Sequence, residues 1–131
     1  MKIFSQNNNM EIHDITNRIV HLPRDFYKLG NVSIGSLLKQ SGYFEVSQKI
    51  GEEDIGKALV AYPKCIDEWM VWSEDKRSSG WYFKKNEKGK YRVGYFPLQQ
   101  DKENNFEYSD ARLACAAFIK REIEEYAKLA R

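Results

Sequence analysis

Short aromatic and β-branched runs alternate with polar turns between Glu68 and Leu98. The runs are Trp69–Trp72, Trp81–Lys84 and Tyr91–Tyr95, and glycine, asparagine and serine fill the turns between them. Aromatic and β-branched side chains suit a pleated, half-buried surface, whereas small polar residues suit turns. In the second and third runs an apolar face lies opposite a more polar one, as in a sheet that is packed on one side. The pattern predicts a three-stranded antiparallel meander, whose first strand is apolar on both faces and therefore central or covered.

Apolar residues at helical spacing predict two helices before the meander. Ser33 is a suitable N-cap for a short helix, and Gly42 is a suitable stop for it. A second helix begins near Gly51, because the acidic residues 52–54 favour the positive end of a helix. Pro63 ends this second helix.

The longest predicted helix lies at the end of the chain, after a polar loop, and Ser109 or Asp110 caps it. Its apolar stripe at the helical period consists of Cys115, Ile119, Ile123, Tyr126 and Ala130. Glu124 and Lys128 are expected to pair on its outer face. The sequence thus predicts an α+β fold, in which an antiparallel meander has helices packed on one face and a long helix follows it.

The length of 131 residues predicts a single domain, 1–131, with one hydrophobic core. Residues 1–10 are expected to be a loose end or a short edge strand, and residues 12–20 have mixed periodicity and are not assigned. No apolar run is long enough to cross a bilayer, and no segment has the pattern of a secretory signal. Cys65 and Cys115 can form one disulfide, but buried free thiols are expected without export signals. The expected location is the cytoplasm.

The formal net charge is only +2, but the charges are segregated along the chain. Residues 45–75 contain eight acidic and three basic residues, a balance of −5. Residues 76–92 contain seven basic residues and one acidic residue, a balance of +6. Residues 101–125 contain seven acidic and four basic residues, a balance of −3. This distribution can steer a charged partner, or it is simply a solvated surface.

The sequence contains no GxSxG elbow, P-loop, GxGxxG, HExxH or paired CxxC motif. His13 and His21 are its only histidines, and a zinc site needs three or four ligands. We therefore expect no enzyme activity, no metal and no cofactor. A small enzyme or ligand-binding protein whose site is formed by residues without a motif stays open as an alternative.

Nucleic-acid binding by the basic region 76–92 is a second alternative. The residues that could contact phosphates are Lys84, Lys85, Lys88, Lys90 and Arg92, and those that could stack on bases are Tyr82, Tyr91 and Tyr95. However, the aromatic residues of the two hairpin strands are mostly spaced to face a helix, and the lysines discourage pairing between sheet edges. Nucleic acid is therefore not the expected partner.

The order of these elements resembles small bacterial immunity proteins, the cognate inhibitors of polymorphic and contact-dependent growth-inhibition toxins. The motifs that resemble this family are Asp67-Glu68-Trp69, Gly80–Phe83, Tyr91–Tyr95, and Phe106–Phe118 with its Ala-Cys step. The resemblance covers roughly the second half of the chain and implies no catalytic residue. It implies a protein that binds the C-terminal domain of one toxin stoichiometrically and blocks its active site or substrate surface. Many nuclease inhibitors are strongly acidic whereas this chain is slightly basic, so the type of toxin is open.

The acidic clusters around the first predicted strand are the expected contact with such a partner. Charge complementarity speeds encounter, and Trp69 or Trp72 is a candidate apolar anchor. The residues expected at the contact, at the ends of this strand, are Asp67, Glu68, Glu74, Asp75, Lys76 and Arg77.

Overall fold

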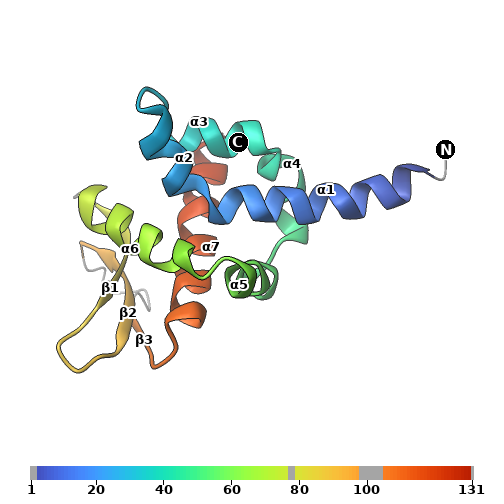
Figure 1. Cartoon of the computed structure of the whole chain (residues 1–131). Helices are drawn as coiled ribbons and strands as arrows, with labels where there is room; N and C mark the ends of the chain where they lie inside the picture. The colour runs from blue at the N-terminus through green and yellow to red at the C-terminus, as the bar shows by residue number, and fades with distance from the viewer. Residues whose placement is uncertain (1–2, 77–78, 98–104, 131) are drawn as a thin grey trace.

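The computed structural model describes residues 3–76, 79–97 and 105–130. Within these ranges seven α-helices and one 3-10 helix accompany a three-stranded sheet (Figure 1). In chain order the elements are α1 Ile3–Val20, α2 Leu22–Leu29, α3 Ile34–Ser41, α4 Tyr43–Val46, η1 Ser47–Lys49, α5 Glu52–Ala61, α6 Lys64–Lys76, β1 Gly80–Lys85, β2 Tyr91–Phe96, β3 Asn105–Tyr108 and α7 Ala111–Ala130. The predicted α+β class, with an antiparallel meander and a long C-terminal helix, is confirmed.

The sheet is an antiparallel meander with the strand order β1-β2-β3. Its first hairpin corresponds to the second and third predicted strands, and the loop closes where the Asn86 N–H donates to the Lys90 carbonyl, 2.8 Å away. The third strand, β3, lies in the predicted polar loop, and there Phe106 pairs with Val93. The prediction of a strand at 69–72 is wrong, because these residues belong to α6.

Residues 64–76 form a helix because their large apolar side chains recur at helical spacing. Cys65, Trp69 and Trp72 are buried on one side of α6. The Trp69 indole N–H donates to the Val20 carbonyl at the end of α1, 2.9 Å away. The apolar ring of Trp69 is thus buried while its polar nitrogen keeps a hydrogen-bond partner.

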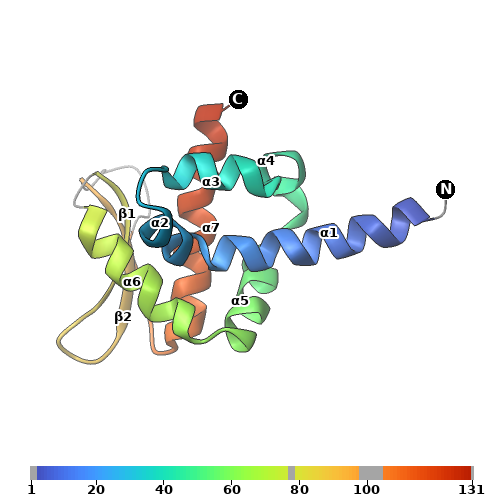
Figure 2. The same cartoon turned by 45° about the horizontal axis from the view of Figure 1, so that its top comes forward.

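The core lies around α7. Figure 2 shows this helix passing between the sheet and helices α3–α5. The Phe118 ring stacks on Phe83 of β1 at a centroid distance of 5.8 Å and meets Trp69 of α6 edge-on at 5.9 Å. Small residues Ala114 and Ala117 are fully buried, so the helix backbone packs closely against its neighbours.

The predicted helix ends are confirmed at three places. The Ser33 hydroxyl accepts the Ser36 N–H at 3.0 Å, and Gly42 ends α3 with a left-handed φ of 91°. The Asp110 carboxylate accepts the Arg112 N–H at 2.8 Å and so caps α7. These local polar contacts satisfy backbone groups that a helix leaves unpaired at its ends.

Three further expectations are wrong. Residues 3–10 are part of helix α1 and do not form an edge strand. Glu124 pairs with Lys120 at 3.3 Å, whereas Lys128 pairs with Glu125 at 3.8 Å, because α7 turns Glu124 toward Tyr43. The buried stripe of α7 ends with Ala127, and Ala130 is exposed.

Candidate binding surface

Helix α6 contains every described residue among the six that the sequence predicts at a partner contact. These are Asp67, Glu68, Glu74, Asp75 and Lys76, and Arg77 lies outside the described residues. The expectation that they stand at the ends of a strand is wrong. The helix nevertheless brings the four acidic residues to one side of the molecule, because positions three and four apart share a helix face.

The outward side of α6 combines negative charge with an exposed apolar side chain. Asp67, Val71 and Glu74 are exposed at intervals of four and three residues, and Val71 retains 52% of its accessible surface. Glu68 and Asp75 flank them, Glu68 being half-buried. We call these five residues the acidic face. Trp69 and Trp72, expected as interface anchors, lie instead on the opposite, buried side.

Asp75 is held in place by the neighbouring helix α2. Its carboxylate accepts a short hydrogen bond from the Tyr27 hydroxyl, 2.5 Å away. Partial burial, and then this carboxylate, raise the pKa of Tyr27 to about 12. The phenol therefore stays protonated at neutral pH and remains a donor, which fixes the orientation of Asp75 at the edge of the acidic face.

Lys76 points inward, unlike the four acidic residues of α6 that the sequence predicts at the contact. Its ammonium lies 2.9 Å from a Glu122 carboxylate oxygen, and the two side chains are only 12% and 6% exposed. The ammonium also lies over the rings of Trp72 and Phe118, at 5.1 and 5.9 Å from their centroids. Burial raises the pKa of Glu122, and Lys76 opposes that shift. This pair joins α6 to α7 in the interior and adds little charge to the surface.

A groove of about 710 Å³ runs between α6 and strand β1. Met70 and Glu74 of α6 form one bank, and the other is formed by the sheet residues Tyr82, Lys84, Lys85 and Phe96. The groove therefore begins where the acidic face ends, because Glu74 belongs to both.

The floor of the groove is closed by a hydrogen bond between helix and strand. The backbone N–H of Phe83 donates to the Ser73 hydroxyl at 2.8 Å, and both groups are buried. Since β1 is an edge strand of the sheet, this bond satisfies a donor that would otherwise face solvent or another strand. Helix α6 thus covers the edge of β1 at its centre.

Tyr82 forms an aromatic surface on the groove side of the sheet. It pairs with Gly94 across the strands, and its phenol lies where a side chain at position 94 would stand. The absence of a side chain at Gly94 lets the ring lie flat across β2. The Lys84 ammonium lies 5.4 Å from the centre of this ring. Phe96, 63% exposed, extends the apolar surface beyond Tyr82.

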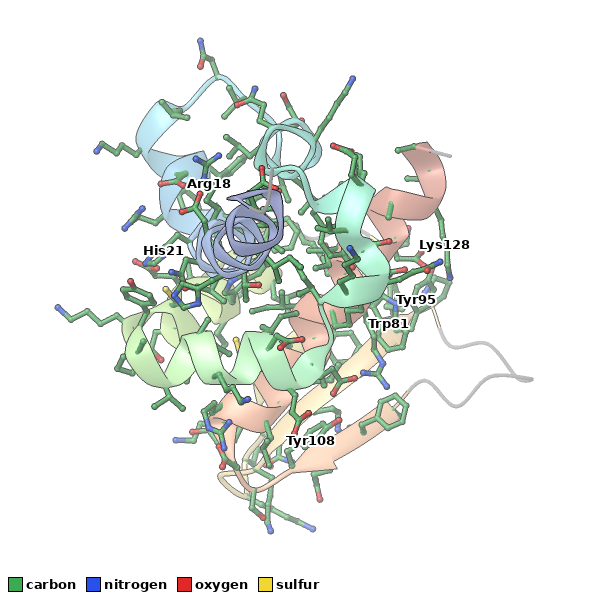
Figure 3. All side chains as sticks on the ribbon, turned by 90° about the vertical axis from the view of Figure 1, so that its right-hand side faces the viewer. Arg18, His21, Trp81, Tyr95, Tyr108 and Lys128 are labelled. Atoms are coloured by element: carbon green, nitrogen blue, oxygen red, sulfur yellow. The ribbon has the colours of Figure 1, made fainter. Side chains whose placement is uncertain are left out.

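The other aromatic residues of the hairpin face α7. Trp81 and Tyr95 pair across the strands and meet edge-on at 5.3 Å (Figure 3). The Arg121 guanidinium of α7 covers Trp81 and Phe106, at 5.4 and 4.6 Å from the ring centres, and reaches Glu52 of α5 at 3.1 Å. Only Tyr82 of the three tyrosines considered for base stacking is on the groove side of the sheet.

The basic residues of the hairpin remain largely exposed. Lys84, Lys85, Lys88 and Lys90 are exposed, and Lys90 donates to the Ser109 hydroxyl at 2.9 Å. The hairpin loop projects away from the helices (Figures 1 and 2). A cationic loop therefore stands on the far side of the groove from the acidic face.

The histidines and cysteines form no candidate metal site in the described part of the chain. Among the described residues, no group of three or more His, Cys, Asp and Glu is arranged to hold a metal ion. His21 lies at the end of α1, edge-on to Tyr62 at 4.6 Å (Figure 3). Cys65 and Cys115 are buried free thiols; burial, and then Glu68, raise the pKa of Cys65 to about 12. No helix in the described ranges is long and apolar enough to span a membrane.

Sequence reasoning found the acidic residues of this surface but not its apolar ones. The sequence pattern predicts a strand for Met70 and Val71, relates Tyr82 only to nucleic acid, and does not identify Phe96 as a contact residue. The helical spacing of Cys65, Trp69 and Trp72 is the signal from which the exposed position of Val71 could have been predicted.

Comparison of the chain with protein-family models, with curated proteins and with solved structures found no match. The resemblance to immunity proteins therefore rests on the sequence motifs of the chain alone.

Proposed function

We propose that this protein is a cytoplasmic immunity protein that neutralises one bacterial toxin domain by stoichiometric binding. The observation that supports the proposal most is the acidic face of α6. There Asp67, Glu74 and Asp75 surround the exposed Val71 on one helix. A charged rim around an apolar centre is the common composition of protein–protein interfaces, and a rigid helix presents it at little cost in conformational entropy.

No chemical step is needed for this function. A bound protein inhibits the toxin when it occupies the active site or the surface that takes the toxin's substrate. Negative charge on the acidic face favours a toxin surface that is positively charged, and long-range attraction between the two accelerates their association.

The proposal implies that a neighbouring gene encodes the toxin, and co-expression with the product of the gene immediately upstream tests it. Cells that express both proteins are expected to survive, and the two proteins are expected to co-purify in equal amounts. Death of the cells, without a complex in the lysate, would contradict it. A vector without the immunity gene is the control for toxicity.

A second candidate function is nucleic-acid binding by the hairpin β1–β2. The exposed lysines Lys84 and Lys85 at the end of β1, and Lys88 in the projecting loop, favour it. Affinity for RNA or DNA that falls with salt, and that falls further in the Lys84→Glu/Lys85→Glu variant, would support this candidate. Absence of binding at low salt would eliminate it.

A further inference from the structure

We infer that the groove between α6 and β1 is the anchor point of the partner. Its occupant is a segment of the toxin domain that places an apolar side chain in the groove and a basic side chain beside Glu74. This inference rests on the proposed function and deepens it, because it states which chemistry the toxin surface has to offer.

Apolar side chains line both walls of the groove. Met70, Tyr82 and Phe96 line the groove together, and Phe96 is 63% exposed. Met70 and Tyr82 are half-buried, so the apolar surface that the groove offers to a partner centres on Phe96. The volume of about 710 Å³ falls in the range of sites that enclose small molecules, roughly 300–1,000 Å³. An aromatic or long aliphatic side chain of a partner therefore fits between the two banks.

Charged residues of opposite sign lie on the two banks of the groove. Glu74 stands on the α6 bank, on the same helix face as Asp67 and beside Asp75, whereas Lys84 and Lys85 stand on the sheet bank. A cationic group of the partner is attracted to the α6 bank and repelled from Lys84, so the charges fix the direction in which the segment lies. The phosphate groups of a nucleic acid would be repelled by the carboxylates along α6.

The contact between Ser73 and Phe83 determines how the segment docks. Because the Phe83 N–H already donates to Ser73, the centre of the β1 edge has no free donor for another strand. The partner therefore docks by its side chains and does not extend the sheet.

Titration calorimetry of the full chain with the upstream gene product used in the co-expression test probes this inference. Phe96→Ser and Glu74→Lys are each expected to weaken binding at least about tenfold, as for central interface residues. The matched controls are Leu129→Ser, at an 84% exposed position near the end of α7, and Glu45→Lys, at an exposed position of α4. Both controls are expected to bind within about twofold of wild type. Circular dichroism melts establish that each variant is folded.

Lys84→Glu separates a basic partner from a polyanionic one. It is expected to bind the toxin domain as tightly as wild type or more tightly, whereas loss of binding would overturn the basic assignment. If wild type binds and folded Phe96→Ser binds with the same affinity, the groove is not the anchor point, but the proposed function still stands. This conclusion holds even if Glu74→Lys binds more weakly. Absence of wild-type binding would overturn both.

Discussion

The Lys76 ammonium lies 2.9 Å from the Glu122 carboxylate in the interior between α6, α7 and β1. The two charges satisfy each other where water has little access, and the Trp72 and Phe118 rings cover the ammonium. Since α6 supplies both the acidic face and one bank of the groove, this internal pair fixes the helix that bears the proposed binding surface.

Removing one partner of this pair is expected to destabilise the protein strongly. Lys76→Met leaves the Glu122 carboxylate buried without a counter-charge, which costs about 3–5 kcal/mol in comparable pairs. The double variant Lys76→Met/Glu122→Met removes both charges and is expected to recover most of that loss. Urea unfolding of the two variants measures the difference, and equal stability of both would contradict this role of the pair.

Glu122 is also expected to make stability depend on pH. Burial raises its pKa in the folded protein above the ordinary value of 4.5, so the folded state keeps a proton that the unfolded state has lost. The contribution of Glu122 to the free energy of unfolding is therefore greatest below pH 4.5 and falls as the pH rises through the folded pKa.

Comparison with Glu122→Gln isolates this contribution. The stability of wild type minus that of the variant is expected to fall as the pH rises above 4.5 and then to level off. Because Lys76 lowers the pKa of Glu122, Lys76→Met is expected to extend the fall to higher pH. A difference that stays constant between about pH 4 and about pH 8 would exclude a raised pKa.

Ser73→Ala is expected to destabilise the junction between α6 and β1. The variant leaves the buried Phe83 N–H without its acceptor, which costs about 1–3 kcal/mol. Ser79→Ala, at an exposed position just before β1, is the matched control and is expected to change stability by less than about 0.5 kcal/mol. Urea unfolding of both variants decides the matter, and equal midpoints would show that the hydrogen bond contributes nothing.

Gly94→Ala is expected to displace the Tyr82 ring from the outer face of the sheet. The added methyl group occupies the place of the phenol, and such overpacking costs about 1 kcal/mol or more. In a Tyr82→Ala background the same change is expected to stabilise the protein by about 0.4–1 kcal/mol, because alanine restricts the unfolded chain more than glycine. A double-mutant cycle measures the coupling between positions 82 and 94. Additive effects of the two substitutions on stability would show that the Tyr82 ring does not lie over Gly94.

Much of the fold could be predicted because its signals are local. Ser33 and Asp110 cap their helices through contacts within three residues along the chain. The hairpin β1–β2 has alternating faces and a short polar loop that identify it. Such features depend on neighbouring residues, which a sequence shows directly.

The errors concern residues whose structure depends on distant partners. Trp69–Trp72 have strand-like composition, but the burial of Trp69 against α1 and Phe118 selects a helix. Strand β3 has only four residues and exists because Phe106 and Tyr108 pair with β2. The strand prediction for Trp69–Trp72 is wrong because these residues are helical. The same helical spacing gathers the four predicted acidic contact residues on one face of α6.

We propose that the acidic face of α6 binds a toxin domain stoichiometrically. Calorimetric titration of the purified toxin domain with wild-type protein, with Asp67→Lys/Glu74→Lys and with the control Glu45→Lys/Glu87→Lys tests this proposal most directly. Wild type and the control are expected to bind one to one, and the affinity of Asp67→Lys/Glu74→Lys is expected to be at least about tenfold lower. Equal affinity of all three proteins, or no binding by wild type, would contradict it.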